Sequence, residues 1–570
     1  MNDFPFGFEQ PDPTTWFYLS SLLTIGLYFK FSSLWRVRNI DLLLLLLLGP
    51  GLLLQDCGHK MQQAAQRLLV AEAAISTVQD APLVDLPGEG GAISAPESDD
   101  AGGQSPNDSG DGANAGDAER FGPLDVGGNS ALGGEPDAAD RALDAAAAAT
   151  SPQTANVSES ATADASIEST SMVQRQRGRF LEMMGFIWLL GVGALLMTRM
   201  LLDPMMVRRP LLEPNLSSGG LIFIGCSLFI LLIAIIVSGT PTPEDLTGAQ
   251  GADKIIAGEA PNEEDDSLRR HGPGYPTLHV LPNLATRVFV AGDEQVPATR
   301  KQQVANVLTA KAMAVLSQLA IVAGIVLIGF RHFDNAKMGI GAAALYLMLP
   351  YTAELTGHVS HLLLAALLVW AVLCYRRPLT AGMFLGLAMG VAYYPFFLLP
   401  LWLSFYWQRG LMRFSIGVGA MLSLTVLSLV FQSSDVFDFW FKFKQIFGLW
   451  FAKMDGLQGV WGLGWDPVWR PPVFLMCFFL SASFALWPAQ KNLGTLLSCS
   501  AALMLAMQFW HGFGGGLFIA WYLPLALLTV FRPNLEDRVA LTVLGEGWFP
   551  RRRRRSDARA FDGKSHERAA

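Results

Sequence analysis

The chain has 570 residues, of which 51% are hydrophobic and only 16% are charged, against about 25% in ordinary soluble domains. Because the charges gather in a few segments, long uncharged runs remain, and the net charge of −8 averages an acidic segment and a distant basic tail. This excludes a soluble protein of ordinary composition and favours an all-α, polytopic membrane helix bundle. Five scattered cysteines argue against a disulfide framework or a zinc site.

Residues 1–74 are expected to form an amino-terminal transmembrane hairpin. Its first run, Trp16 to Trp35, has the length of about 20 residues that a membrane-spanning helix needs. The second run ends at Leu54 and spans only if its helix continues into residues 60–74.

Residues 75–178 differ completely in character, being rich in Ala, Gly, Asp, Ser and Pro. Residues 80–170 contain 18 acidic and two basic side chains, with Phe121 as the one aromatic residue. Such a segment buries too little apolar surface to offset its conformational entropy. We therefore predict a disordered, low-complexity acidic insert, with an acidic tether for a basic partner as the less favoured reading.

Apolar runs resume after the insert and continue almost to the carboxyl end. Within this part, residues 381–406 form either two short helices or one kinked helix, because Pro395 interrupts the run. The expected segments are a transmembrane pair at 179–239, an outer-face loop at 240–305, a main transmembrane domain at 306–532 that includes a span at 515–531, and a basic tail at 533–570.

Basic residues in the short loops set the expected orientation. If Arg36 and Arg38 lie in the cytoplasm, later basic clusters such as Arg376 and Arg377 also fall inside, which predicts about 13 transmembrane helices. The amino terminus is then outside and the carboxyl terminus cytoplasmic. The five arginines at 551–555 are expected to neutralise anionic lipids; no aromatic stacking pattern accompanies them, so no nucleic acid is expected as a partner.

The outer loop at 432–470 is rich in aromatic residues at roughly helical spacing, among them Phe437, Trp440 and Phe441. We interpret it as an amphipathic helix on the membrane surface. The aromatic residues form either an interfacial belt or a lipid- or sugar-binding lip. In the second case Lys442 and Lys453 would meet a phosphate.

Two histidines, His358 and His361, occur in the string GHVSH. At the start of a helix they share a face. A structural or hydrogen-bonding role, contact with a substrate, and metal binding are the three alternatives, and no third ligand is close in sequence for the last of these.

Two acidic groups could supply a general base. Glu244 and Asp245 follow the run that ends at Ser238, while Asp265 and Asp266 precede Arg270. A solvated acidic loop is the competing interpretation, since catalysis needs one carboxylate beside a substrate hydroxyl. The string GPGYP at 272–276 indicates a turn. No P-loop, dinucleotide fingerprint, HExxH or GxSxG string occurs in the sequence.

Residues 341–410 resemble one region of the polyprenol-phosphate-sugar-dependent glycosyltransferases with the GT-C fold, in particular the mannosyltransferase-like branch. The matching pieces are Pro350, Gly357-His358, Arg376-Arg377-Pro378, Ala381-Gly382, Gly386-Leu387-Ala388 and Tyr394-Pro395. Ala392 and Tyr393 stand where that family commonly has a lysine before Tyr-Pro. The resemblance implies a catalytic acid on the first outer loop, a place that Glu244 and Asp245 occupy.

We therefore expect a bacterial inner-membrane protein that moves a sugar from a lipid-phosphate donor on the outer face, with membrane lipids and a polyprenol-phosphate sugar as partners. No cofactor is expected; a divalent cation is left open. The alternative is a non-catalytic membrane scaffold or a transporter-like protein. The expected catalytic residues are Asp245, Glu244, Asp265 and Asp266, and the expected substrate-binding residues are His358, His361, Arg270, Lys442 and Lys453.

Overall fold

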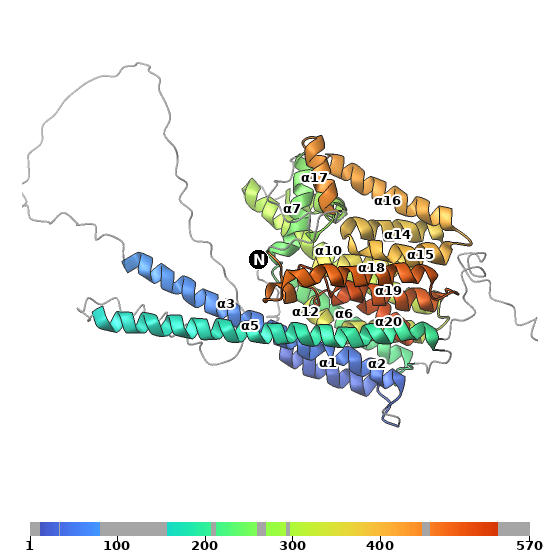
Figure 1. The fold of residues 1–570 in the computed structure, drawn as a ribbon, viewed down its shortest axis with the longest axis horizontal. Helices are drawn as coiled ribbons and strands as arrows, with labels where there is room; N and C mark the ends of the chain where they lie inside the picture. Colours follow the sequence, from blue (N-terminus) through green and yellow to red (C-terminus); the bar gives the residue numbers. More distant parts are fainter. Residues whose placement is uncertain are drawn as a thin grey trace, which may run out of the picture. The chain divides into compact units, whose positions relative to one another are not determined.

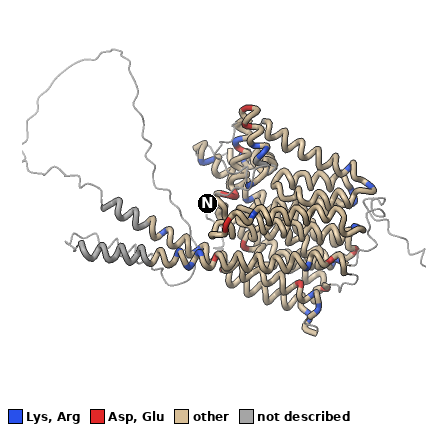
Figure 2. The backbone as a smooth tube through the Cα atoms, in the orientation of Figure 1, with Lys and Arg blue, Asp and Glu red and all other residues tan. Residues whose placement is uncertain are grey.

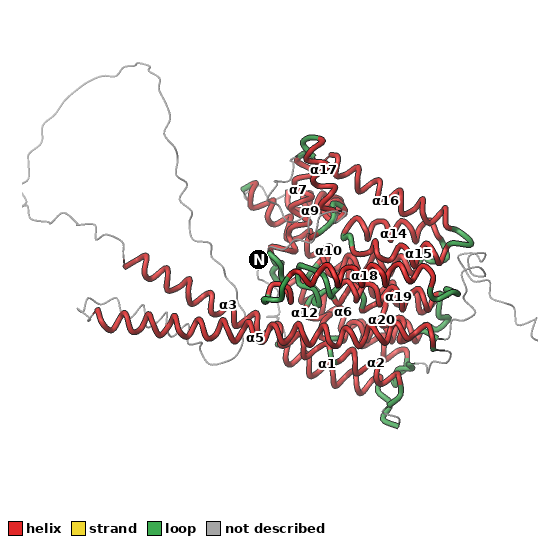
Figure 3. The backbone as a smooth tube through the Cα atoms, viewed as in Figure 1, coloured by secondary structure: helices red, strands yellow, loops and turns green. Residues whose placement is uncertain are grey.

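Every regular element in the described part of the chain is a helix, as the composition predicts (Figure 3). The computed structural model describes residues 12–32, 35–79, 157–206, 212–258, 270–291, 297–431, 433–446 and 456–533. It divides into two units, one made of residues 1–62 and 174–570 and the other of residues 63–173. The second unit holds the later part of α3 and the first part of α5, and the site described below lies in the first unit.

The amino-terminal half of the fold consists of long helices with few turns (Figure 1). They are α1 (Pro13–Tyr28), α2 (Val37–Leu46), α3 (Leu48–Gln79), α5 (Val157–Leu202), α6 (Ser218–Ser238), α7 (Pro243–Ala257), α9 (Gly274–Ala291) and α10 (Ala298–Arg331), with a 3-10 turn, η1 (Asp203–Met205), after α5.

The remaining helices are shorter and more often broken. They are α11 (Ala336–Met348), α12 (Pro350–Glu354), α13 (Val359–Leu373), α14 (Pro378–Val391), η2 (Tyr394–Leu398), α15 (Leu399–Tyr406), α16 (Leu411–Phe431), α17 (Val436–Ile446), η3 (Gly459–Gly462), η4 (Pro467–Trp469), α18 (Arg470–Leu486), α19 (Leu493–Met507), η5 (Ile519–Trp521) and α20 (Leu523–Phe531). The run at 381–406 thus forms two helices, α14 and α15, separated by η2 around Pro395.

Several helices have the length and composition of membrane spans, which is compatible with a multi-pass membrane protein. In the described part of the chain six helical stretches qualify by those two measures. Five further apolar helices are shorter, 10–17 residues each. The long candidates are Val37–Val70, Thr170–Met205, Ser218–Ser238, Ala298–Arg331, Leu411–Val430 and Pro467–Leu486. The total of about 13 spans stays a prediction.

Helix α5 corrects part of the expected disordered insert. It begins at Val157, so the expectation does not hold for residues 157–178. This stretch has no proline and contains several Ala, Glu, Gln and Arg residues, which favour a helix, and it runs directly into an apolar span. Helix α3 similarly continues to Gln79, and residues 80–156 lie outside the described part.

The segment expected as an outer-face loop, 240–305, contains helices α7 and α9, the first capped by Thr242 and the second beginning at Gly274. One further expectation needs correction. The expected span at 515–531 is helical throughout only in α20, which begins at Leu523. Before it, Gly514 and Gly516 have φ angles of 84° and 101°, a conformation that ends regular helical structure.

Helices α14 and α16 cross in close contact through glycines. A methyl group at Gly382 would overlap the carbonyl oxygen of Phe414, and one at Gly417 would overlap the carbonyl oxygen of Leu379. Gly382, Gly386 and Gly390 lie four residues apart and therefore share one face of α14. Such small residues let helix backbones approach closely where lipid removes the hydrophobic driving force between helices.

A buried ion network joins the first helices to the end of the bundle. The guanidinium of Arg199 in α5 binds both carboxylate oxygens of Asp41 in α2, at 2.6 and 2.9 Å. It also donates to Asp203 at 3.1 Å, and Arg532 donates to the other oxygen of Asp203 at 2.5 Å. All four side chains are less than 10% exposed, so removing one would leave this buried network with a net charge.

We predict that Gly417→Ala destabilises the protein by about 1–3 kcal/mol, because the added methyl group overpacks the contact between α14 and α16. Gly419→Ala in the same helix is the matched control: nothing lies within 4 Å of its added methyl group, and alanine favours a helix. Thermal unfolding in detergent should show a lower melting temperature for the first variant alone. Equal melting temperatures would contradict the close crossing.

Candidate functional site

Helix α7 begins with a capping box that places a carboxylate at its amino terminus. The backbone N–H and the hydroxyl of Thr242 both donate to Oδ2 of Asp245, at 3.1 and 2.7 Å. The Asp245 N–H donates back to the Thr242 hydroxyl at 3.4 Å. The carboxylate also lies in the first turn, where the helix dipole stabilises a negative charge. Asp245 is therefore held in one position, with its side chain 3% exposed.

The other oxygen of this carboxylate contacts His358. Asp245 Oδ1 lies 3.1 Å from His358 Nδ1, and this contact links α7 to the start of α13 across 113 residues of sequence. An ionised carboxylate only accepts, so Nδ1 is the donor. The His358 side chain is 29% exposed, and its Nε2 has no hydrogen-bond partner among the described residues. The pair therefore presents an imidazole nitrogen outward, with a buried carboxylate behind it.

The two groups shift one another's pKa. Burial alone would lower the pKa of His358, but the hydrogen bond and charge of Asp245 outweigh it and raise the pKa above 6.5. Burial alone would raise the pKa of Asp245, but the bonds from His358 and Thr242 outweigh it and lower the pKa below 3.8. The aspartate is therefore charged near neutral pH, and it favours the protonated form of His358.

A cation and a second carboxylate lie next to the pair. Arg270 Nη1 is 3.6 Å from Glu244 Oε1, and both side chains are partly exposed, at 27% and 44%. The Arg270 guanidinium also lies over the ring of Phe513, 5.4 Å from its centroid. Because the ion pair is long and reaches solvent, Arg270 is available to an anionic group such as a phosphate.

The predicted turn at 272–276 fixes the residues around Arg270. The Gly272 N–H donates to the carbonyl oxygen of Val391 at 2.8 Å, at the end of α14. A methyl group at Gly272 would overlap the carbonyl oxygen of Gly390, so only glycine permits this approach. The turn then leads into α9 at Gly274. Its docking on α14 sets the position of Arg270 and His271 beside α7.

Buried histidines and aromatic rings form the inner wall of the site. His271 stacks on Tyr275 with ring centroids 4.4 Å apart, and His361 stacks on Phe518 at 4.2 Å. His361 Nδ1 also lies 3.1 Å from the Tyr351 hydroxyl. His511 stacks on Tyr394 at 4.6 Å. Burial, the charge of Arg270 and the charge of His279 lower the pKa of His271 to about 3, so this ring stays neutral.

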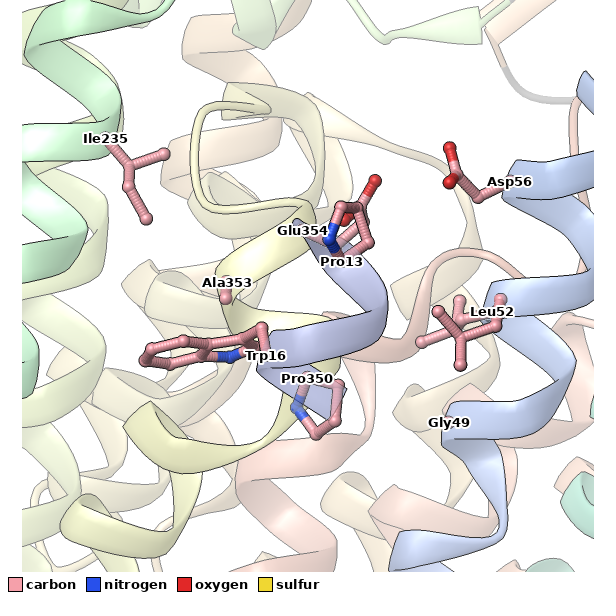
Figure 4. Close-up of a pocket in the computed structure, with 10 residues that line it drawn as sticks. Pro13, Trp16, Gly49, Leu52, Asp56, Ile235, Pro350, Ala353 and Glu354 are labelled. Atoms are coloured by element: carbon pink, nitrogen blue, oxygen red, sulfur yellow. The ribbon is translucent and has the colours of Figure 1, made fainter. Parts of the chain in front are cut away.

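A small cavity lies close to the site, between α1, α3, α6 and α12. It measures about 30 Å³ and includes Trp16, Asp56 and Glu354 in its wall (Figure 4). This is room for roughly one or two water molecules, not for a sugar. Glu354 precedes His358 by four residues, and its charge helps to raise the pKa of that histidine. The Glu354 carboxylate in the wall of this cavity therefore interacts electrostatically with His358.

The structure brings some of the predicted site residues together. Asp245, Glu244, Arg270 and His358 lie at one place, and His361 is buried behind His358 with ring centroids 5.7 Å apart. Lys442 lies in α17, where its ammonium binds Asp438 at 2.7 Å. Asp265, Asp266 and Lys453 lie outside the described residues.

Sequence reasoning missed Thr242, His271 and His511. The spacing of Thr242 and Asp245 is that of a capping box and was available as a signal. His271 and His511 each begin an H-G-x-G string, HGPG and HGFG, which marks both as histidines beside tight turns. In the part of the chain that the structure describes, no group of three or more His, Cys, Asp or Glu residues could hold a metal ion.

In comparisons with known proteins, no family model, no curated protein and no solved structure matches this chain. Its described helices support the class of a helical protein that is compatible with multiple membrane passes.

We predict that acid destabilises the fold, because histidines buried in their neutral form at this site become protonated on unfolding. Burial, the charge of Arg470 and the charge of His271 lower the pKa of His511 to about 3, as for His271. A histidine whose pKa is lower in the folded than in the unfolded protein stabilises the fold fully above the unfolded-state pKa of 6.5. This stabilisation is lost as the pH falls from 6.5 towards the folded-state pKa of about 3. From pH 7.5 to pH 5 the loss should be about 2 kcal/mol per histidine.

Replacement of His271 by phenylalanine keeps the stack on Tyr275 and removes the titrating group. The His271→Phe variant should therefore lose about 2 kcal/mol less than the wild type between pH 7.5 and pH 5, measured by denaturant unfolding in detergent. The same replacement at the exposed His59 is the control and should keep the wild-type pH dependence. A His271→Phe variant with the wild-type pH dependence would show that His271 is not buried in its neutral form.

Proposed function

We propose that this chain is an integral membrane enzyme that transfers a sugar from a lipid-phosphate donor, as the resemblance to GT-C glycosyltransferases implies. The observation that carries the proposal is the 3.1 Å contact between buried Asp245 and the partly exposed His358, with Arg270 nearby. A positioned imidazole held by a carboxylate is a common general base, and a guanidinium suits a phosphate leaving group.

In this mechanism His358 takes the role of the base and Asp245 orients it. The acceptor hydroxyl gives its proton to His358 Nε2 while its oxygen forms a bond to the anomeric carbon of the sugar. The bond from that carbon to the phosphate oxygen breaks, and the electron pair leaves with the lipid phosphate. Arg270 stabilises the charge on the departing phosphate. Asp245 is too buried to reach a substrate itself, so it acts as a positioning residue.

We also propose that the site faces the outside of a bacterial inner membrane, with the amino terminus outside and the carboxyl terminus in the cytoplasm. The positive-inside rule supports this orientation. Figure 2 shows lysines and arginines at the end of the bundle where α13 is joined to α14 and α15 to α16. Helices α7 and α9 lie towards the opposite end (Figure 3).

The second candidate is a non-catalytic membrane scaffold or a transporter-like protein. The observation that favours a scaffold is the capping box, because the bonds to Asp245 from Thr242 and His358 also lock α7 against α13. The test below separates the two, since a purely structural pair changes stability without changing chemistry.

We predict that His358→Gln lowers sugar transfer by about 100- to 10,000-fold, because the general base is lost. Asp245→Asn should lower it as well, since the imidazole loses its orientation and charge partner. The assay uses membranes containing the full-length chain, labelled polyprenol-phosphate mannose or glucose, and mass spectrometry of envelope glycans in a deletion strain. His59→Gln in α3, an exposed histidine outside the site, is the control and should behave as the wild type.

Two results would contradict the proposed function. Unchanged envelope glycans and lipids on deletion would show that the chain moves no sugar. A His358→Gln protein that transfers sugar at the wild-type rate, with a wild-type melting temperature, would remove His358 from the chemistry and leave the scaffold as the better account.

A further inference from the structure

Helix α17 has an outward face made of large apolar side chains. Val436 is 69% exposed, Phe437 is 85% exposed and Trp440 is 52% exposed. These residues are one, three or four positions apart and so form a single stripe along the helix. In water, each large apolar side chain left exposed loses the favourable free energy that burial would give it.

One ion pair of α17 lies on its other side, whereas Lys444 near the end of the helix is exposed. Asp438 and Lys442 form an ion pair of 2.7 Å, and their side chains are only 14% and 5% exposed. Phe443 lies on this inner side too, where it lines a narrow cavity with Pro273 of the docked turn and Gly390 of α14. The helix therefore has its charged pair turned inward and its apolar stripe turned outward, the reverse of a helix at the surface of a soluble protein.

The outward stripe continues an apolar surface that belongs to the neighbouring candidate span. On α16, the helix that precedes α17, Leu424, Leu427 and Val430 are each about half exposed. At the start of α18, another candidate span, Trp465 and Trp469 are also exposed, at 48% and 63%. Tryptophans at the ends of spans mark the boundary between lipid and water.

We propose that α17 lies in the plane of the membrane interface and that its partner is the lipid of the leaflet at this end of the bundle. Phe437 and Trp440 insert among the acyl chains just below the headgroups, and the inward pair of Asp438 and Lys442 is shielded by the protein. Figure 1 shows α17 running across the direction of α16, as a helix in the membrane plane must. This inference does not depend on whether His358 is catalytic.

The experiment places a nitroxide label at single cysteines in the full-length chain reconstituted in phosphatidylcholine vesicles. The background carries Cys57→Ser and Cys226→Ser, because these two cysteines are exposed and the other three are buried. Phe437→Cys and Trp440→Cys report on the outward stripe. Ser434→Cys, an exposed polar position just before α17, is the matched control. Electron paramagnetic resonance then compares collision of each label with oxygen, which enters lipid, and with a nickel chelate, which stays in water.

The labels at 437 and 440 should show an oxygen-to-nickel collision ratio several-fold higher than the label at 434. Two reporters are used so that one misfolded variant does not decide the outcome, and a wild-type melting temperature is required of each. Ratios equal to that at 434 would place the stripe in water and overturn the proposal. Exclusion of both reagents from positions 437 and 440 would also overturn it, because the stripe would then be covered by protein.

Discussion

The hydrogen bond between Asp245 and His358 is the constraint on which the organisation of the site depends. A buried carboxylate is costly unless it is hydrogen-bonded, and Asp245 is satisfied by two segments, the cap of its own helix and the start of α13. That requirement brings α7 onto the bundle. The docked turn at Gly272 then brings Arg270 and His271 to the same place.

A second polar constraint acts away from this site, where Arg199 joins Asp41, Asp203 and Arg532. Between these two polar clusters the helices pack through apolar side chains and glycines. The two clusters differ in exposure: the Arg199 network is almost fully buried, which suits a structural role, whereas His358 and Arg270 reach the surface. That contrast is the physical reason for assigning chemistry to one cluster and not the other.

The apolar runs were enough to predict the helical class and most helix positions, because length and hydropathy alone determine which segments can cross a bilayer. The helices α7, α9 and the first part of α5 were not predicted, since caps, turns and propensity form them without an apolar run. Asp245 and His358 were both named from the sequence, but their contact was not, because it joins residues far apart in the chain. The burial of His271 and His511 likewise depends on packing that no local pattern encodes.

The central claim, that Asp245 holds His358 as a base, is tested most directly by the pKa of His358. Nuclear magnetic resonance of the chain labelled with ¹⁵N-histidine measures it, with His358→Gln to assign the signal. The account predicts a pKa above 6.5 in the wild type, because the hydrogen bond and charge of Asp245 outweigh burial. In Asp245→Asn burial still lowers the pKa and the charges of Glu244 and Glu354 still raise it, but the hydrogen bond and charge of Asp245 are lost, so the pKa should fall below that of the wild type. The same pKa in both proteins would contradict the account.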